Sequence, residues 1–72
     1  MTGPPLDLRG LSCPEPALRT RETLARAASG EVVVLVDSAT SRDNVERTAR
    51  LAHWRADVEP QPDGSFLLVL RR

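Results

Sequence analysis

Hydrophobic and polar positions repeat along this chain with two different periods, which predicts strands and helices in one fold. Leu6–Arg9 alternates apolar and charged residues, and this period of two predicts a short first strand that Gly10 ends. Glu31–Asp37 encloses a continuous run of valine and leucine. A strand that is apolar on both faces is typical of a sheet interior, so we expect 31–37 to be the central strand.

A helix is predicted to follow the first strand, with Cys13 as its N-cap residue. Pro14 fits the first helical position and Pro16 the third, because N–H groups in the first turn have no intrahelical partner to lose. Gly30 is expected to stop this helix. At helical spacing one face is apolar and is predicted to be buried, namely Ala17, Leu18, Leu24, Ala25 and Ala28.

A second helix is predicted after the central strand. Candidate N-cap residues come directly after that strand, namely Ser38, Thr40 and Ser41. Asp43 lies near the positive end of the helix dipole, where a carboxylate is favourable. The expected buried face is narrow and small and consists of Val45, Ala49 and Ala52, with Thr48 between them.

The last part of the chain is predicted to form a β-hairpin. Trp54–Glu59 alternates as a half-buried strand would, with Trp54 on the core side, and Pro60 is expected to end it. Pro62–Gly64 predicts a turn, because proline fixes φ and glycine tolerates the left-handed region. An apolar second strand follows over Ser65–Leu70.

The order strand, helix, strand, helix, strand, strand predicts a two-layer α/β sandwich. A right-handed crossover makes the first two strands parallel, so we expect a mixed four-stranded sheet with both helices on one face. Both helices then begin at the same sheet edge, which brings Ser38–Asp43 toward Cys13. We expect one domain over residues 1–72, with residues 1–5 disordered.

Composition narrows the chemistry. A single cysteine excludes an internal disulfide, a CxxC pair and a cysteine-rich zinc site, and it favours a reducing compartment, so a cytoplasmic location is expected. No signal peptide or membrane span is visible, and no membrane partner is expected. Ten arginines balance ten acidic residues and lysine is absent, which excludes Schiff-base catalysis and does not favour direct nucleic-acid binding. The only histidine, His53, is expected at the surface rather than as a catalytic base.

Cys13 is the candidate catalytic residue. At a helix N-terminus the dipole and the Glu15 N–H favour a thiolate, whereas the Glu15 carboxylate opposes it. An exposed thiolate attacks a persulfide without a histidine base, because the persulfide already has a good leaving group. The residues alone leave open the alternative that Cys13 is a small buried residue that caps the helix.

Two segments carry a resemblance to a known family. Leu6-Asp7 with Gly10-Leu11-Ser12-Cys13-Pro14-Glu15-Pro16, and then Thr40-Ser41-Arg42-Asp43, resemble the two signatures of the TusA/SirA-type sulfur carriers with their CPxP motif. The resemblance implies the fold of the C-terminal domain of translation initiation factor three. It also implies that Cys13 accepts persulfide sulfur from a donor protein, a cysteine desulfurase or a rhodanese, without a cofactor or a metal.

The resemblance further implies an acceptor protein, in tRNA thiolation, molybdenum-cofactor synthesis or sulfur oxidation. Pro14, Glu15 and Pro16 are the motif residues and the candidates for tuning the thiol, and the alternative for Glu15 is a structural role as a favourable charge in the first helical turn. Arg9, Arg42 and Asp43 are candidate docking residues, with a surface or capping role as the alternative.

Two other functions stay open at this point. One is a non-enzymatic protein- or RNA-interaction module that binds through Arg9, Arg42, Arg47 and Arg50 and carries an incidental thiol. The other is a redox sensor, which needs an external thiol because the chain has no second cysteine. The sequence favours a sulfurtransferase or carrier, and it does not distinguish sulfur from selenium as the cargo.

Overall fold

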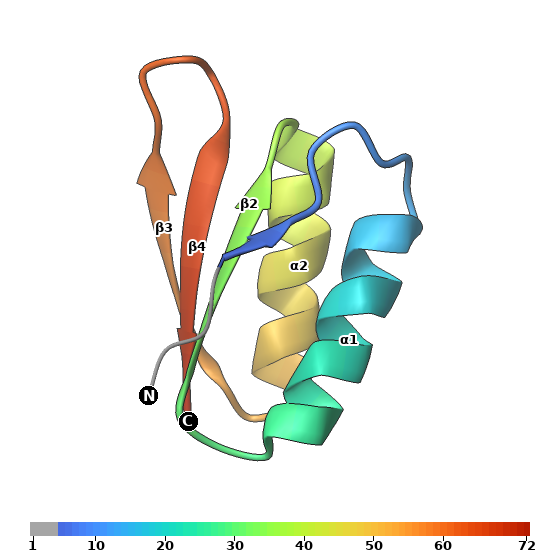
Figure 1. The fold of residues 1–72 in the computed structure, drawn as a ribbon, viewed down its shortest axis with the longest axis vertical. Helices are drawn as coiled ribbons and strands as arrows, with labels where there is room; N and C mark the ends of the chain where they lie inside the picture. The colour runs from blue at the N-terminus through green and yellow to red at the C-terminus, as the bar shows by residue number, and fades with distance from the viewer. Residues whose placement is uncertain (1–4) are drawn as a thin grey trace.

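The computed structural model describes residues 5–72, which form a four-stranded sheet with two helices (Figure 1). The elements in chain order are β1 (Leu6–Asp7), α1 (Glu15–Ala27), β2 (Glu31–Val36), α2 (Ala39–Leu51), β3 (Arg55–Pro60) and β4 (Phe66–Arg71). This order is the predicted one. Disorder of residues 1–5 stays a prediction, and residues 1–4 lie outside the described part of the chain.

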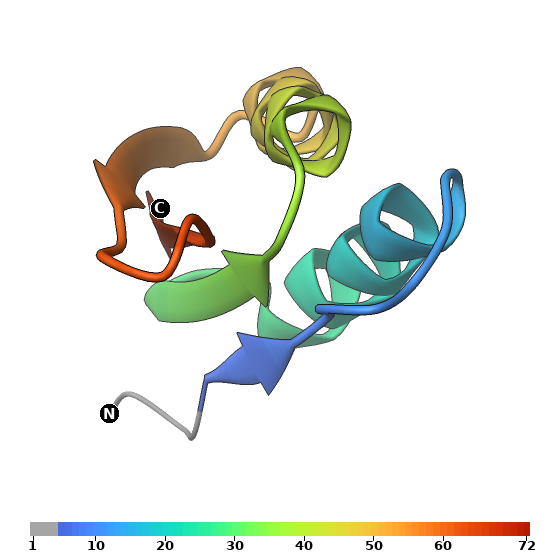
Figure 2. The same cartoon turned by 90° about the horizontal axis from the view of Figure 1, so that it is seen from above.

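The sheet has the strand order β1-β2-β4-β3, so β2 lies in its interior as predicted. β1 pairs with β2 in parallel, and β4 pairs antiparallel with both β2 and β3. Both helices cover the same face of the sheet (Figure 2). The fold is therefore the expected two-layer α/β sandwich with a mixed sheet. Because α1 and α2 each follow a strand of the parallel pair, both helices start at the same end of the molecule (Figure 1).

The core lies between the sheet and the helices. Alternate residues of β2 and β4 face it, and Val34, Val36, Leu68 and Leu70 have no exposed surface. On the opposite face of β2 the side chains of 33 and 35 are half-buried. A two-layer fold explains this difference, because one face of the sheet packs on helices and the other does not.

The buried face of α1 differs from the predicted one. Leu24 faces the core as predicted, together with Pro16 and Thr20. Leu18 is 44% exposed, and Ala25 and Ala28 are exposed as well. Thr20 can be buried because its hydroxyl donates a hydrogen bond to the Pro16 carbonyl at 2.8 Å. Burial of an alanine side chain contributes little hydrophobic free energy. The alanine-rich apolar stripe therefore did not determine which face of α1 packs on the sheet.

The rest of the core follows the predictions closely. In α2 the buried residues are Ser41, Val45 and Ala49, and Ala52 is half-buried just beyond the end of the helix. Trp54 is buried, as its alternation indicated.

The hairpin forms as expected. Pro60 is the last residue of β3 and pairs with Phe66, the first residue of β4. In the connection Gly64 has φ +88° and donates its N–H to the Gln61 carbonyl at 3.1 Å. A left-handed φ at this turn position favours glycine, which is why the Pro-Asp-Gly pattern located the turn correctly.

Candidate functional site

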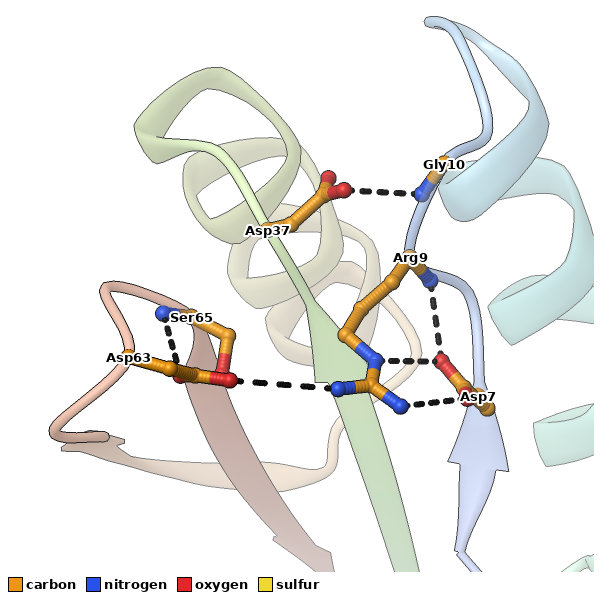
Figure 3. A network of polar contacts seen from close by, with 6 residues as sticks. All are labelled: Asp7, Arg9, Gly10, Asp37, Asp63 and Ser65. Carbon is orange, nitrogen blue, oxygen red and sulfur yellow. Dashed lines mark hydrogen bonds and ion pairs between the residues drawn. The ribbon is translucent and has the colours of Figure 1, made fainter.

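The side chain of Cys13 is exposed, on the segment that links β1 to α1. Two hydrogen bonds hold the first part of this segment against the C-terminal end of β2. The Leu8 N–H donates to the Leu35 carbonyl at 2.8 Å, and the Gly10 N–H donates to Asp37 Oδ2 at 2.8 Å (Figure 3). The thiol thus lies on a loop held at one end by β2, and the alternative of a buried capping cysteine is wrong.

The start of α1 is shifted by one residue from the predicted position. Pro14, not Cys13, is the N-cap residue, and the helix begins at Glu15 with Pro16 as its second residue. The Glu15 N–H donates to the Ser12 carbonyl at 2.9 Å and closes a turn before the helix. This amide is therefore not the partner of the Cys13 sulfur that the sequence predicted.

The sulfur instead has a partner on the second helix. Asn44 Nδ2 donates a hydrogen bond to Cys13 Sγ over 3.4 Å, across 31 positions of the sequence. Asn44 is half-buried on α2, just past the helix start that was expected to approach Cys13. Sequence analysis missed this residue, although an amide side chain directly after the expected Ser38–Asp43 stretch was the available signal.

Glu15 and Pro16 each have a structural role in the first turn of α1. The Glu15 carboxylate forms an ion pair with Arg19 at 3.3 Å, one turn further along α1. Pro16 is buried beneath the start of the helix. A tuning role of Glu15 toward the thiol stays a prediction, in either direction.

Arg9 lies in a network that joins β1 to the β3–β4 turn (Figure 3). Its Nε and Nη2 donate to the Asp7 carboxylate at 3.0 and 2.9 Å, and its Nη1 lies 3.9 Å from Asp63 Oδ2. Asp63 also accepts hydrogen bonds from the N–H and the hydroxyl of Ser65, which lower its pKa. Arg9 therefore presents a guanidinium that is already paired within the chain.

The Arg9 contacts predict an acid titration that is easily measured. Hydrogen bonds from the Arg9 side chain and backbone lower the pKa of Asp7 from 3.8 to about 2. Because the pKa is depressed in the fold, the stabilisation by this pair is fully present above pH about 4 and is lost as pH falls toward about 2. Carboxyl NMR shifts of Asp7 should show this low midpoint. Arg9→Gln should raise it, and an unchanged midpoint in that variant would contradict the assignment.

Arg42 and Asp43 lie in the first turns of α2, toward the end of the molecule where both helices begin. Arg42 Nε is 3.0 Å from Asp43 Oδ1, and the guanidinium lies 4.8 Å from the centre of the Phe66 ring. The helix cap is provided by Ser38, whose Oγ accepts from the Ser41 N–H at 3.1 Å. Asp43 is thus not the N-cap residue, and its docking role stays a prediction, as does that of Arg42.

Neither a metal centre nor a membrane segment is found among residues 5–72. No three His, Cys, Asp or Glu side chains in this range come close enough together to hold a metal ion. No helix in it combines the length and the apolar character needed to cross a membrane. His53 is exposed just beyond the C-terminal end of α2, nine residues after Asn44.

Fold and site together define a small α/β sandwich that presents one exposed thiol at the sheet edge where both helices begin. The family described as Sulfurtransferase TusA matches residues 5–72, and the chain belongs to this family of sulfurtransferases and sulfur carriers. The crystal structure of the SirA-like protein from Desulfitobacterium hafniense is similar, with a TM-score of 0.87 at 29% sequence identity. The match covers 99% of this chain and 96% of that one.

Proposed function

We propose that the protein is a sulfur carrier in which Cys13 holds the cargo as a persulfide. The observation that carries this proposal is the exposed thiol on the anchored loop before α1, in a chain of the TusA family. Persulfide exchange needs an accessible thiolate and a leaving group on the donor, and it needs no enclosed pocket. A small sandwich with a surface cysteine meets these requirements.

The proposed reaction consists of two sulfur exchanges. In loading, the Cys13 thiolate attacks the outer sulfur of a donor persulfide, the new S–S bond forms, and the donor cysteine leaves as a thiolate with the electron pair of the broken bond. In release, an acceptor nucleophile attacks the outer sulfur and the Cys13 thiolate leaves. Neither step needs an external oxidant or reductant, because the sulfane sulfur keeps its oxidation state throughout.

Donor and acceptor proteins must approach the end of the molecule that carries Cys13. We propose a cysteine desulfurase or a rhodanese as donor, and an acceptor in tRNA thiolation, molybdenum-cofactor synthesis or sulfur oxidation. Arg9, Arg42 and Asp43 are the proposed docking charges. Since each is paired within the chain, docking exchanges one ion pair for another and contributes more to orientation than to affinity. A reducing compartment, the cytoplasm, suits the free thiol.

The proposal is tested by loading the protein with sulfur in vitro. Incubation with a cysteine desulfurase and free cysteine should add one sulfur atom to the wild-type chain, located at Cys13 by peptide mass spectrometry. A reducing agent should remove it. Peroxide provides the comparison for the redox-sensor alternative, which requires oxidation of Cys13 faster than that of free cysteine. Failure of loading with several desulfurases and rhodaneses would contradict the carrier function.

A further inference from the structure

The Cys13 sulfur and its hydrogen-bond donor lie on different elements of the fold. Cys13 belongs to an irregular connection, whereas Asn44 belongs to α2, a 13-residue helix capped by Ser38. The Asn44 amide reaches Sγ over 3.4 Å from the second turn of this helix. The Glu15 N–H donates to the Ser12 carbonyl instead of the sulfur. Among residues 5–72 the Asn44 side chain is therefore the one hydrogen-bond donor to Cys13 Sγ.

We propose that Asn44 stabilises the anionic form of the Cys13 sulfur and so sets how readily this thiol reacts and leaves. This inference rests on the proposed carrier function and adds to it a residue that contacts the reacting atom. An N–H donated to sulfur favours the thiolate over the thiol, because the charged acceptor makes the stronger hydrogen bond. The carboxamide carries two N–H groups, so it has a further donor for an outer sulfur about 2 Å beyond Sγ.

The two exchange steps depend on this contact in different ways. In loading, the hydrogen bond increases the fraction of thiolate but decreases the nucleophilicity of each thiolate, with a Brønsted slope of about 0.4–0.5. These effects partly cancel at neutral pH. In release, the Cys13 sulfur is the leaving group, and its stabilisation as an anion accelerates departure at every pH. Asn44 is therefore expected to matter more for release than for loading.

Replacement of Asn44 tests this inference on the thiol itself. The rate of Cys13 alkylation by iodoacetamide is measured against pH for Asn44→Leu, which removes the donor, and Asn44→Asp, which replaces it with a carboxylate. For Asn44→Leu we expect the midpoint of the profile to move to higher pH, because the N–H that favours the thiolate is lost. Asn44→Asp should raise it further, because the carboxylate repels the thiolate.

Release is measured on protein loaded with persulfide, with 2-mercaptoethanol as the acceptor. The loss of one hydrogen bond to the leaving thiolate, scaled by the Brønsted slope, predicts release from Asn44→Leu that is about threefold slower than from the wild type. Thr48→Val is the matched control, an uncharged polar-to-apolar change one turn further along the same side of α2. It should leave both the alkylation profile and the release rate unchanged.

The outcomes separate this inference from the carrier function. Wild-type alkylation profiles in both Asn44 variants would overturn it, and so would an equal shift in Thr48→Val. Thermal unfolding of each variant checks that the fold is intact. If one of the two Asn44 variants does not fold, the other still tests the inference. Absence of a persulfide on the wild-type protein contradicts the carrier function alone, because alkylation needs no sulfur donor and still decides whether Asn44 acts on the thiol.

Discussion

Replacement of Cys13 by serine should reduce sulfur loading to the background level of a reaction without protein. The thiolate is the nucleophile in persulfide exchange, and a serine hydroxyl is not ionised at neutral pH. Serine also has no S–S bond to form, so it cannot hold the cargo in an exchangeable state. We expect no added sulfur on Cys13→Ser after incubation with desulfurase and cysteine, under conditions that load the wild type completely.

The fold should tolerate this change, which makes the comparison clean. Cys13 is exposed, and among residues 5–72 its side chain has one polar contact, the hydrogen bond from Asn44. Surface substitutions of this kind alter the free energy of unfolding by less than about 0.5 kcal/mol. Equal labelling of Cys13→Ser and wild type would contradict the role of this thiol. Intact activity of Cys13→Ala in cells would favour an interaction module instead.

The architecture was predictable because each element carried a local signal that tertiary packing did not override. The valine-rich run at 31–37 indicated an interior strand, and β2 indeed pairs on both sides. The Pro62–Gly64 turn follows from backbone sterics, and Gly64 has the positive φ that such a turn uses. Two β-α-β connections of the same handedness then place both helices on one face of the sheet.

The rotation of α1 and its first residue were not predictable from the same signals. Alanine-rich helices have weak apolar stripes, and the burial of Thr20 depends on a hydroxyl bond to Pro16 that composition does not reveal. Proline is tolerated at any position of the first helical turn, because its missing N–H has no intrahelical partner there. Pro14 and Pro16 are therefore compatible with more than one N-cap position. In the structure the Glu15 N–H donates to the Ser12 carbonyl, and the helix starts one residue later than predicted.

The position of Cys13 directly before α1 was predictable from the sequence, whereas the hydrogen bond to its sulfur was not. An exposed cysteine before a proline-opened helix is a local pattern, but the Asn44 contact spans 31 positions and depends on how α1 and α2 lie beside each other. The same holds for Arg9, whose pairing with Asp63 joins the segment after β1 to the β3–β4 turn on the other side of β2. Contacts of this kind follow from the assembled sheet edge.

Leu68→Ala should destabilise the fold by more than any surface change. Leu68 has no exposed surface and lies in β4 between Val34 of β2 and Val58 of β3. A buried leucine truncated to alanine costs about 2–5 kcal/mol through lost transfer energy and a residual cavity. A domain of this length has a total stability of roughly 4–11 kcal/mol, so this single change removes a large part of it. At about 4–8 °C per kcal/mol, Tm should fall by about 10 °C or more.

The matched control for this prediction is the same substitution at an exposed leucine. Leu51 is 75% exposed at the end of α2, so Leu51→Ala loses little buried area and gains slightly in helix propensity. Its free energy of unfolding in urea should stay within about 0.5 kcal/mol of the wild type. Equal destabilisation by the two variants would mean that the sheet does not pack on the helices through Leu68. Partial unfolding of Leu68→Ala should also remove the Asn44 contact to Cys13, because that contact exists only while both helices are held on one face of the sheet.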